Sequence, residues 1–128
     1  MPLNVDQLLV RARERLVRVD AARAAEELAA GALLIDIRPA DQRAAQGDIP
    51  GATVIDRNAL EWRLDPSSPW HVASVGDHDT RIILICAEGF QSSLAAANLQ
   101  EMGLVNATDV IGGFESWAAA GLPVQPSP

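Results

Sequence analysis

Residues 81–99 read RIILICAEGFQSSLAAANL, and this stretch decides the fold. Four large apolar residues, Ile82 to Ile85, lead directly into Cys86, the only cysteine of the chain. A short polar loop with Gly89 follows, and then an alanine-rich segment typical of a helix. A short apolar strand, a loop and a helix in this order are typical of a parallel sheet that is buried on both faces.

The rest of the chain alternates short apolar stretches with segments of helical pattern. We expect strands at 32–36, 52–56, 82–86 and 107–111. We expect two helices within the first 30 residues, and further helices at 39–46, 58–64, 94–103 and 114–121. Asp20 fits the N-cap of the second helix and Gly31 its end. The alternation predicts an α/β fold with a central parallel sheet of about four to five short strands and helices on both faces.

The length of 128 residues fits one domain with its own core. We expect the domain at 20–124, preceded by an N-terminal helical extension at 1–19 and followed by a frayed tail at 125–128. The apolar residues of the extension recur at helical spacing as far as Val19. Its arginines favour a solvated helix face, because Glu14 interrupts them, and a binding patch is the alternative.

Composition limits the partners. The net charge is −7 and all ten basic residues are arginines without a basic stripe, which argues against nucleic acid or an anionic membrane as the main partner. No apolar run approaches the roughly 18 residues that a membrane span needs. The N-terminus has no signal-peptide pattern and one cysteine suits a reducing compartment, so we expect a cytoplasmic protein. We also expect a bacterial source.

Cys86 lies where a thiol can become reactive, because ligands of open α/β sheets bind beyond the carboxyl ends of the strands. If the next helix begins near Ser92 or Ser93, its free amides and positive dipole end face the loop. Amides around the sulfur would form an anion cradle and favour the nucleophilic thiolate. The alternative is a small buried apolar residue, but the polar loop with its glycine favours a site.

Three segments resemble the rhodanese-like sulfurtransferase family, in the family's order. They are LLIDIRPADQRAAQGDIPGA (33–52), IILICAEGFQSSLAAANLQEMGL (82–104) and VIGGFESWAAAGLPV (110–124). The first resembles the opening strand, Asp-x-Arg and turn of the family, the second its strand, active loop and helix, and the third its closing Gly-Gly element. The resemblance covers about residues 20–124 and implies the family's α/β fold.

The resemblance also implies a function. Cys86 would take a sulfane sulfur from a donor such as thiosulfate, hold it as a persulfide, and pass it to an acceptor such as cyanide or a thiol. Asp36 and Arg38 match the Asp-x-Arg that braces the region around the loop. No cofactor is implied. The resemblance assigns the persulfide cradle to the amides of Ala87, Glu88, Gly89, Phe90, Gln91 and Ser92.

The loop departs from the family in its charges. Gln91 stands where an arginine is usual, and Glu88 adds a carboxylate. We therefore expect thiosulfate, a dianion, to be a poor donor, and a neutral or protein-bound persulfide to be a better one. Arg57 and Arg63 follow the second strand and could lend positive charge to the pocket, or could form ordinary surface salt bridges.

Two other functions are compatible with the fold. A catalytically silent binding or regulatory module would explain the acidic loop, and a protein partner could then dock on the N-terminal helix. A phosphatase or arsenate reductase needs an arginine six residues after the cysteine, but Ser92 stands there and no arginine follows Cys86. His71 and His78 do not form a metal-ligand spacing with the distant cysteine, so we expect no metal.

Overall fold

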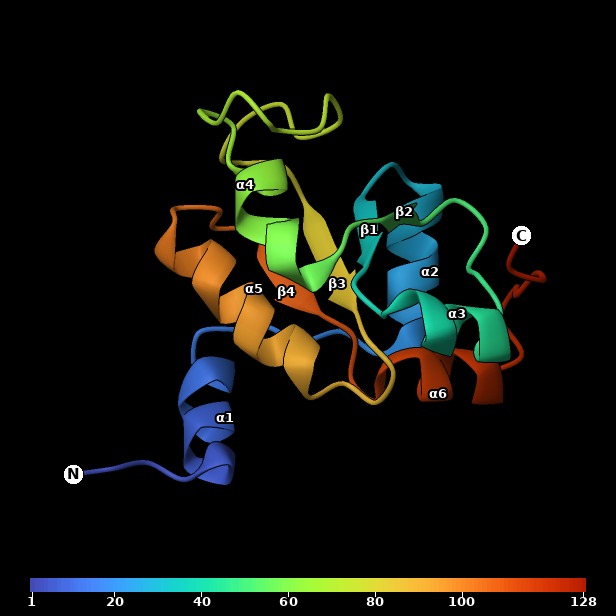
Figure 1. Cartoon of the computed structure of the whole chain (residues 1–128), viewed down its shortest axis with the longest axis horizontal. Coiled ribbons are helices and arrows are strands. Elements are labelled where there is room, and N and C mark those ends of the chain that lie inside the picture. Colours follow the sequence, from blue (N-terminus) through green and yellow to red (C-terminus); the bar gives the residue numbers. More distant parts are fainter.

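The computed structural model describes residues 1–128, and at its centre is a four-stranded sheet in the order β2-β1-β3-β4 (Figure 1). All three strand pairings are parallel. The strands are β1 (Leu33–Asp36), β2 (Thr53–Val54), β3 (Ile82–Ile85) and β4 (Ala107–Asp109). The helices are α1 (Val5–Arg13), α2 (Ala21–Ala29), α3 (Ala40–Gln46), the short 3-10 helix η1 (Arg57–Ala59), α4 (Leu60–Leu64), α5 (Gln91–Glu101) and α6 (Gly113–Ala119). The predicted α/β architecture is confirmed.

Strand β3 contributes to two separate apolar cores, because successive side chains of a strand point to opposite faces of the sheet. Ile82 and Leu84 pack in the core beneath α4 and α5, and Ile83 and Ile85 pack in the core beneath α2 and α6. Figure 1 shows these two pairs of helices on opposite sides of the sheet. Cys86 belongs to the first core, so its side chain lies on the α5 side.

Local signals in the sequence set several helix ends. The Asp20 carboxylate accepts a hydrogen bond from the backbone amide of Arg23 at 2.8 Å and caps α2, as predicted. Gly47 ends α3. Trp117 of α6 is 2% exposed and donates its indole N–H to the Pro123 carbonyl at 2.9 Å, so it anchors the last helix in the core. α5 begins at Gln91, three residues earlier than expected.

The first helix is shorter than its apolar spacing predicts. α1 ends at Arg13, and the chain then turns and runs to the edge of the sheet. There Val19 donates its amide to the Asp109 carbonyl at 3.2 Å and accepts a hydrogen bond from the Ile111 amide at 2.8 Å. The free backbone groups beside β4 compete with helix formation at this point. α1 itself packs along α5 (Figure 1).

The end of the chain returns to the turn after α3. Asp48 and Gln125 exchange two backbone hydrogen bonds, of 2.7 and 2.9 Å. The tail that we expected to fray from residue 125 is therefore held at its first residue.

None of the helices combines the length and the apolar character that crossing a membrane requires.

Candidate active site at Cys86

The Cys86 thiol lies between the end of β3 and the start of α5, and the residue is 7% exposed. The backbone amides of Gly89 and Ser92 donate to its Sγ atom, at 3.1 and 3.4 Å. Fixed amide donors stabilise negative charge on a sulfur. The remaining residues of the predicted cradle belong to the same loop, but their amides make no hydrogen bond to Sγ: Ala87, Glu88, Phe90 and Gln91.

Gly112 and Gly113, which follow β4, leave room for the cysteine loop to pack against them. Within the loop, Gly89 has a φ of +88°, and the backbone of Gly112 fills the space beside its Cα. A Cβ on Gly113 would clash with the Cys86 carbonyl oxygen and lie 2.7 Å from the Gly89 amide nitrogen. The Cys86 carbonyl accepts a hydrogen bond from the Phe114 amide at 2.7 Å. The start of α6 is therefore packed directly against the cysteine loop.

A series of buried hydrogen bonds connects the thiol to the end of β4. The Cys86 thiol donates to Ser92 Oγ at 3.2 Å, and that hydroxyl donates to Asp109 Oδ2 at 2.7 Å. The Ser93 hydroxyl donates to the same oxygen at 2.7 Å. Arg18 holds the other side of the carboxylate, with Nε 2.8 Å from Oδ1 and Nη2 3.2 Å from Oδ2. The negative charge of Asp109 is thus compensated without solvent.

Helix α1 brings a second arginine to the loop. Arg13 donates to the Gly89 carbonyl at 2.8 Å and to Ser93 Oγ at 3.1 Å. Its guanidinium carbon lies 6.0 Å from the centroid of the Phe90 ring. Arg18 donates to the same Gly89 carbonyl at 3.1 Å. The N-terminal segment therefore fixes the middle of the loop from outside the sheet.

Arg13 and Arg18 do not lie on a solvated face, which corrects our expectation for these two side chains. Burial and repulsion from Arg18 lower the pKa of Arg13, whereas the charges of Asp109 and Cys86 act in the opposite direction. The sequence did contain one signal for this arrangement. Asp109 belongs to a short apolar strand, and a carboxylate buried there requires a cation.

Asp36 and Arg38 form a second buried ion pair, with 2.7 Å between Oδ2 and Nη2. Arg38 also donates to the Gly47 carbonyl at 2.9 Å, and its guanidinium carbon lies 4.0 Å from the centroid of the Phe114 ring. Because the Phe114 amide holds the carbonyl of Cys86, this pair supports the loop indirectly.

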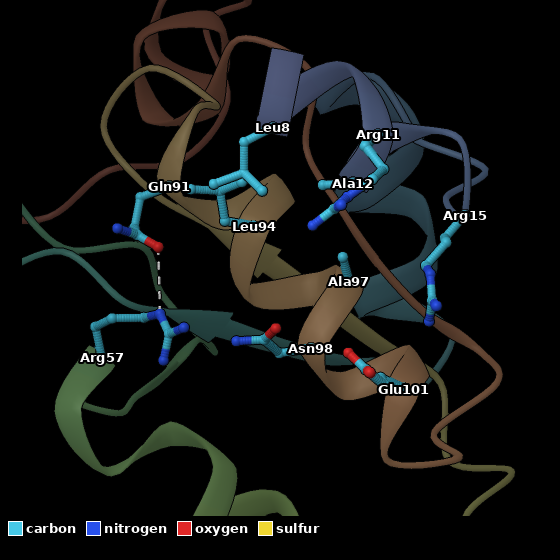
Figure 2. Close-up of a pocket in the computed structure, with 10 residues that line it drawn as sticks. All are labelled: Leu8, Arg11, Ala12, Arg15, Arg57, Gln91, Leu94, Ala97, Asn98 and Glu101. Carbon is cyan, nitrogen blue, oxygen red and sulfur yellow. Dashed lines mark hydrogen bonds between the residues drawn. The ribbon is translucent and has the colours of Figure 1, made fainter. Parts of the chain in front are cut away.

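The two arginines after β2 lie in different places. Arg57 Nε donates to Gln91 Oε1 at 3.3 Å (Figure 2). Its Nη1 pairs with Glu61 at 2.9 Å. Arg63 instead donates to the Trp70 carbonyl at 3.0 Å. It lines a separate cavity of about 470 Å³ that includes no residue of the cysteine loop. The structure brings Arg57 to the loop and leaves Arg63 elsewhere.

A cavity of about 240 Å³ opens over Cys86. Its only arginine is Arg38, whose charge is already paired with Asp36. The exposed carboxylate of Glu88 also lines it, together with Gln91 at the start of α5. No unpaired cation therefore faces this cavity.

Comparisons with known proteins agree with this geometry. The model of the rhodanese-like domain family matches residues 20–120. Thiosulfate sulfurtransferase GlpE of Actinobacillus succinogenes is 35% identical over 94 residues, which cover 73% of this chain and 76% of that protein. The chloroplastic thiosulfate sulfurtransferase 16 of Arabidopsis thaliana is 30% identical over 101 residues, which cover 77% of this chain and 83% of that protein.

Two solved structures resemble the whole fold. A Rhodopseudomonas palustris protein described as of unknown function and a possible tyrosine phosphatase is 30% identical with a TM-score of 0.87, and the alignment covers 98% of this chain and 96% of that one. This alignment includes α1. A rhodanese-related protein from Thermoplasma volcanium is 27% identical with a TM-score of 0.67, and the alignment covers 86% of this chain and 98% of that one. The chain belongs to the rhodanese-like domain family.

Proposed function

We propose that this protein is a sulfurtransferase that carries a sulfane sulfur as a persulfide on Cys86. The observation that carries the proposal is the pair of backbone amides, of Gly89 and Ser92, that point at Sγ at the carboxyl end of a parallel strand. The relatives named thiosulfate sulfurtransferases support the same reaction class. A catalytically silent module is the less favoured function, because the thiol and its amide donors are both in place.

The reaction needs two displacements at sulfur. In the first, the Cys86 thiolate attacks the outer sulfur of the donor, the sulfur–sulfur bond of the donor breaks, and the remainder leaves with the electron pair. In the second, a thiolate or cyanide attacks the outer sulfur of the persulfide, and Cys86 leaves as the thiolate. The amides of Gly89 and Ser92 stabilise that leaving thiolate. Neither step changes the total number of electrons, so no redox cofactor takes part.

The charges around the cavity support a persulfide as the better donor. Glu88 lines the cavity over Cys86. The only arginine that lines the same cavity, Arg38, is already paired with Asp36. A dianion such as thiosulfate would meet repulsion there without an unpaired cation to offset it. Arg57 is paired with Glu61 and does not line this cavity, so we propose that it positions the Gln91 side chain and that Arg63 has no part in the site.

Intact-protein mass spectrometry tests the proposal. Reduced protein is incubated with thiosulfate or with a low-molecular-weight persulfide, and is then treated with cyanide. We expect a gain of about 32 Da that cyanide removes as thiocyanate, and no gain in Cys86→Ser. The persulfide should load the protein at a lower concentration than thiosulfate. An unloaded protein whose Cys86 still reacts with an alkylating reagent would instead support the binding module.

Phosphate-ester hydrolysis is the second candidate, because the Rhodopseudomonas palustris structure is described as a possible tyrosine phosphatase. That chemistry needs a guanidinium group beside the loop amides to bind the oxyanion. Arg13 and Arg18 hydrogen-bond to the backbone of this loop, both at the carbonyl of Gly89, and Arg57 bonds only to the Gln91 side chain. We expect no hydrolysis of a generic aryl phosphate, and measurable turnover that requires Cys86 would reverse this preference.

We also propose that the protein works in a bacterial cytoplasm, where a reducing environment keeps its single thiol free. The GlpE relatives from bacteria support this source. For the domain we propose residues 20–124, with residues 1–19 as a part of the active site rather than a separate unit. The contacts of Arg13 and Arg18 with the Gly89 carbonyl support the assignment of residues 1–19 to the active site.

A further inference from the structure

A second cavity lies next to the cysteine loop, between α1 and α5 (Figure 2). Its volume is about 550 Å³, which lies within the range of about 300 to 1,000 Å³ that is typical of small-molecule sites. The apolar part of its lining is contributed by Leu8, Ala12, Leu94 and Ala97. Of the residues that line the cavity over Cys86, only Gln91 also lines this one.

The cavity is lined by the two arginines of the protein that have no partner. The chain has ten arginines, and only Arg11 and Arg15 have a guanidinium group with no hydrogen bond or ion pair to the rest of the protein. They stand four residues apart on one face of the N-terminal segment, and Figure 2 shows both beside the cavity. In a chain with a net charge of −7, two free guanidinium groups at one cavity point to an anionic ligand.

The other polar groups narrow the class of ligand. Glu101 is the only carboxylate that lines the cavity, and it forms no ion pair in the protein. It can therefore receive an ammonium group. The side-chain nitrogen of Asn98 donates to Glu61 at 3.2 Å, and its side-chain oxygen can accept a hydrogen bond from a peptide group. Free cations, one free carboxylate, an amide and an apolar wall together suit a short peptide or amino acid that has more carboxylates than ammonium groups.

The position of the cavity links such a ligand to the thiol. Gln91 lines this cavity and also the smaller cavity over Cys86. Its side chain accepts a hydrogen bond from Arg57 (Figure 2). A ligand anchored between α1 and α5 can therefore extend past Gln91 toward the sulfur.

We propose that this cavity binds the carboxylates of a peptide-like thiol and of its persulfide, and directs their sulfur to Cys86. The reaction rests on the sulfur-transfer function proposed above, whereas the binding does not. The Cys86 thiolate attacks the outer sulfur of the persulfide RS–SH, the RS–S bond breaks, a Cys86 S–S bond forms, and RS⁻ leaves with the electron pair. The proton stays on the transferred sulfur, and the reverse reaction makes the same thiol an acceptor.

The binding is tested without turnover by calorimetric titration of Cys86→Ser protein with S-methylglutathione, which carries two carboxylates and one ammonium group and cannot transfer sulfur. We expect saturable binding that weakens about tenfold in Arg11→Gln/Arg15→Gln. The dimethyl ester of S-methylglutathione, which lacks both carboxylate charges, should bind more weakly than S-methylglutathione by a similar factor. Arg23→Gln removes an exposed charge on α2 and should bind like the parent. Absent binding, or equal weakening by both sets of substitutions, overturns the site.

A kinetic experiment separates this inference from the proposed function. With glutathione persulfide as donor, Arg11→Gln/Arg15→Gln should raise KM about tenfold and leave kcat unchanged, while Arg23→Gln changes neither. A fall in kcat at unchanged KM would contradict a binding role. If S-methylglutathione binds as expected but Cys86 never gains sulfur, the ligand site stands and the sulfur-transfer function fails. If Cys86 gains sulfur but the ligand does not bind, the site fails alone.

Discussion

Arg18 donates two hydrogen bonds, of 2.8 and 3.2 Å, to the carboxylate of Asp109, at the point where β4 ends beside the cysteine loop. The Asp109 side chain has no exposed surface, and that of Arg18 is 15% exposed. A carboxylate without access to water depends on fixed partners for its charge. A residue that precedes the segment matched by the family model therefore balances a charge at the centre of the site.

Replacing this arginine should destabilise the fold. We expect Arg18→Gln to lower the free energy of unfolding by about 3 kcal/mol, because it leaves the Asp109 charge buried with weaker partners. Chemical denaturation measures the change. Arg23→Gln, which removes exposed ion pairs on α2, should cost less than about 1 kcal/mol. In the double variant Arg18→Gln/Asp109→Asn part of the loss should return, and strictly additive losses would refute a direct coupling.

Replacing Arg13 should act on the reactivity of the thiol more than on stability. Arg13→Gln removes a positive charge and two hydrogen bonds from the loop, at the Gly89 carbonyl and Ser93 Oγ. We expect alkylation of Cys86 by iodoacetamide at fixed pH to slow by a factor of roughly three to ten. Arg13→Lys should restore part of the rate. Arg11→Gln changes the same charge on the same helix without touching the loop, and an equal slowing there would show that net charge alone matters.

A methyl group on Gly113 should disturb the loop from the other side. Gly113→Ala places a Cβ against the Cys86 carbonyl oxygen and the Gly89 amide. We expect a loss of at least about 3 kcal/mol in unfolding free energy, together with reduced loading of Cys86 with sulfur. Gly121→Ala is the matched control, because Gly121 also has a positive φ, of +73°, but has open space around it. It should cost about 1 to 2 kcal/mol and leave loading unchanged.

Stability should fall in acid partly through Glu27. The hydrogen bond from Arg81, 2.8 Å long, lowers the pKa of Glu27 below its usual value of 4.5, although partial burial acts in the opposite direction. A carboxyl group whose pKa is lower in the folded state stabilises the fold above its unfolded pKa and loses this contribution as the pH falls through the folded pKa.

Glu27→Gln should therefore be less stable than the parent near neutral pH, and the difference should shrink as the pH drops below 4.5. Thermal unfolding at several pH values measures it. Glu26→Gln removes the neighbouring, exposed carboxylate, whose ion pair with Arg23 spans 3.7 Å. A pH-dependent difference of the same size in that variant would show that the effect does not come from the Arg81 contact.

The parts of the fold that could be predicted depend on short-range patterns. Apolar runs predict β1 and β3, and Asp20 and Gly31 predict the ends of α2. The strand-to-helix turn predicts that Cys86 lies at the carboxyl end of β3. Each of these features is determined within about ten residues of the chain, where side-chain periodicity and capping act.

The charges of the site could not be predicted in this way. Arg13 and Arg18 lie 76 and 71 residues from Gly89 in the chain, and no spacing links them to it. Their contact depends on the end of α1 at Arg13 and on the path of the next six residues along β4. Arg57 and Arg63 looked equivalent in the sequence, but a 3-10 turn and one turn of α4 direct them to different cavities.

The stretch before α2 also protects the sheet from other chains. β4 is an outer strand, and Val17 and Val19 occupy part of its free side through bonds to Thr108, Asp109 and Ile111. An uncovered outer strand is a template for intermolecular pairing and aggregation. A shortened chain that starts at residue 20, where the family match begins, would expose these groups. We expect such a fragment to elute as large aggregates in size-exclusion chromatography, so that the segment that carries Arg18 to the thiol site also keeps neighbouring copies apart.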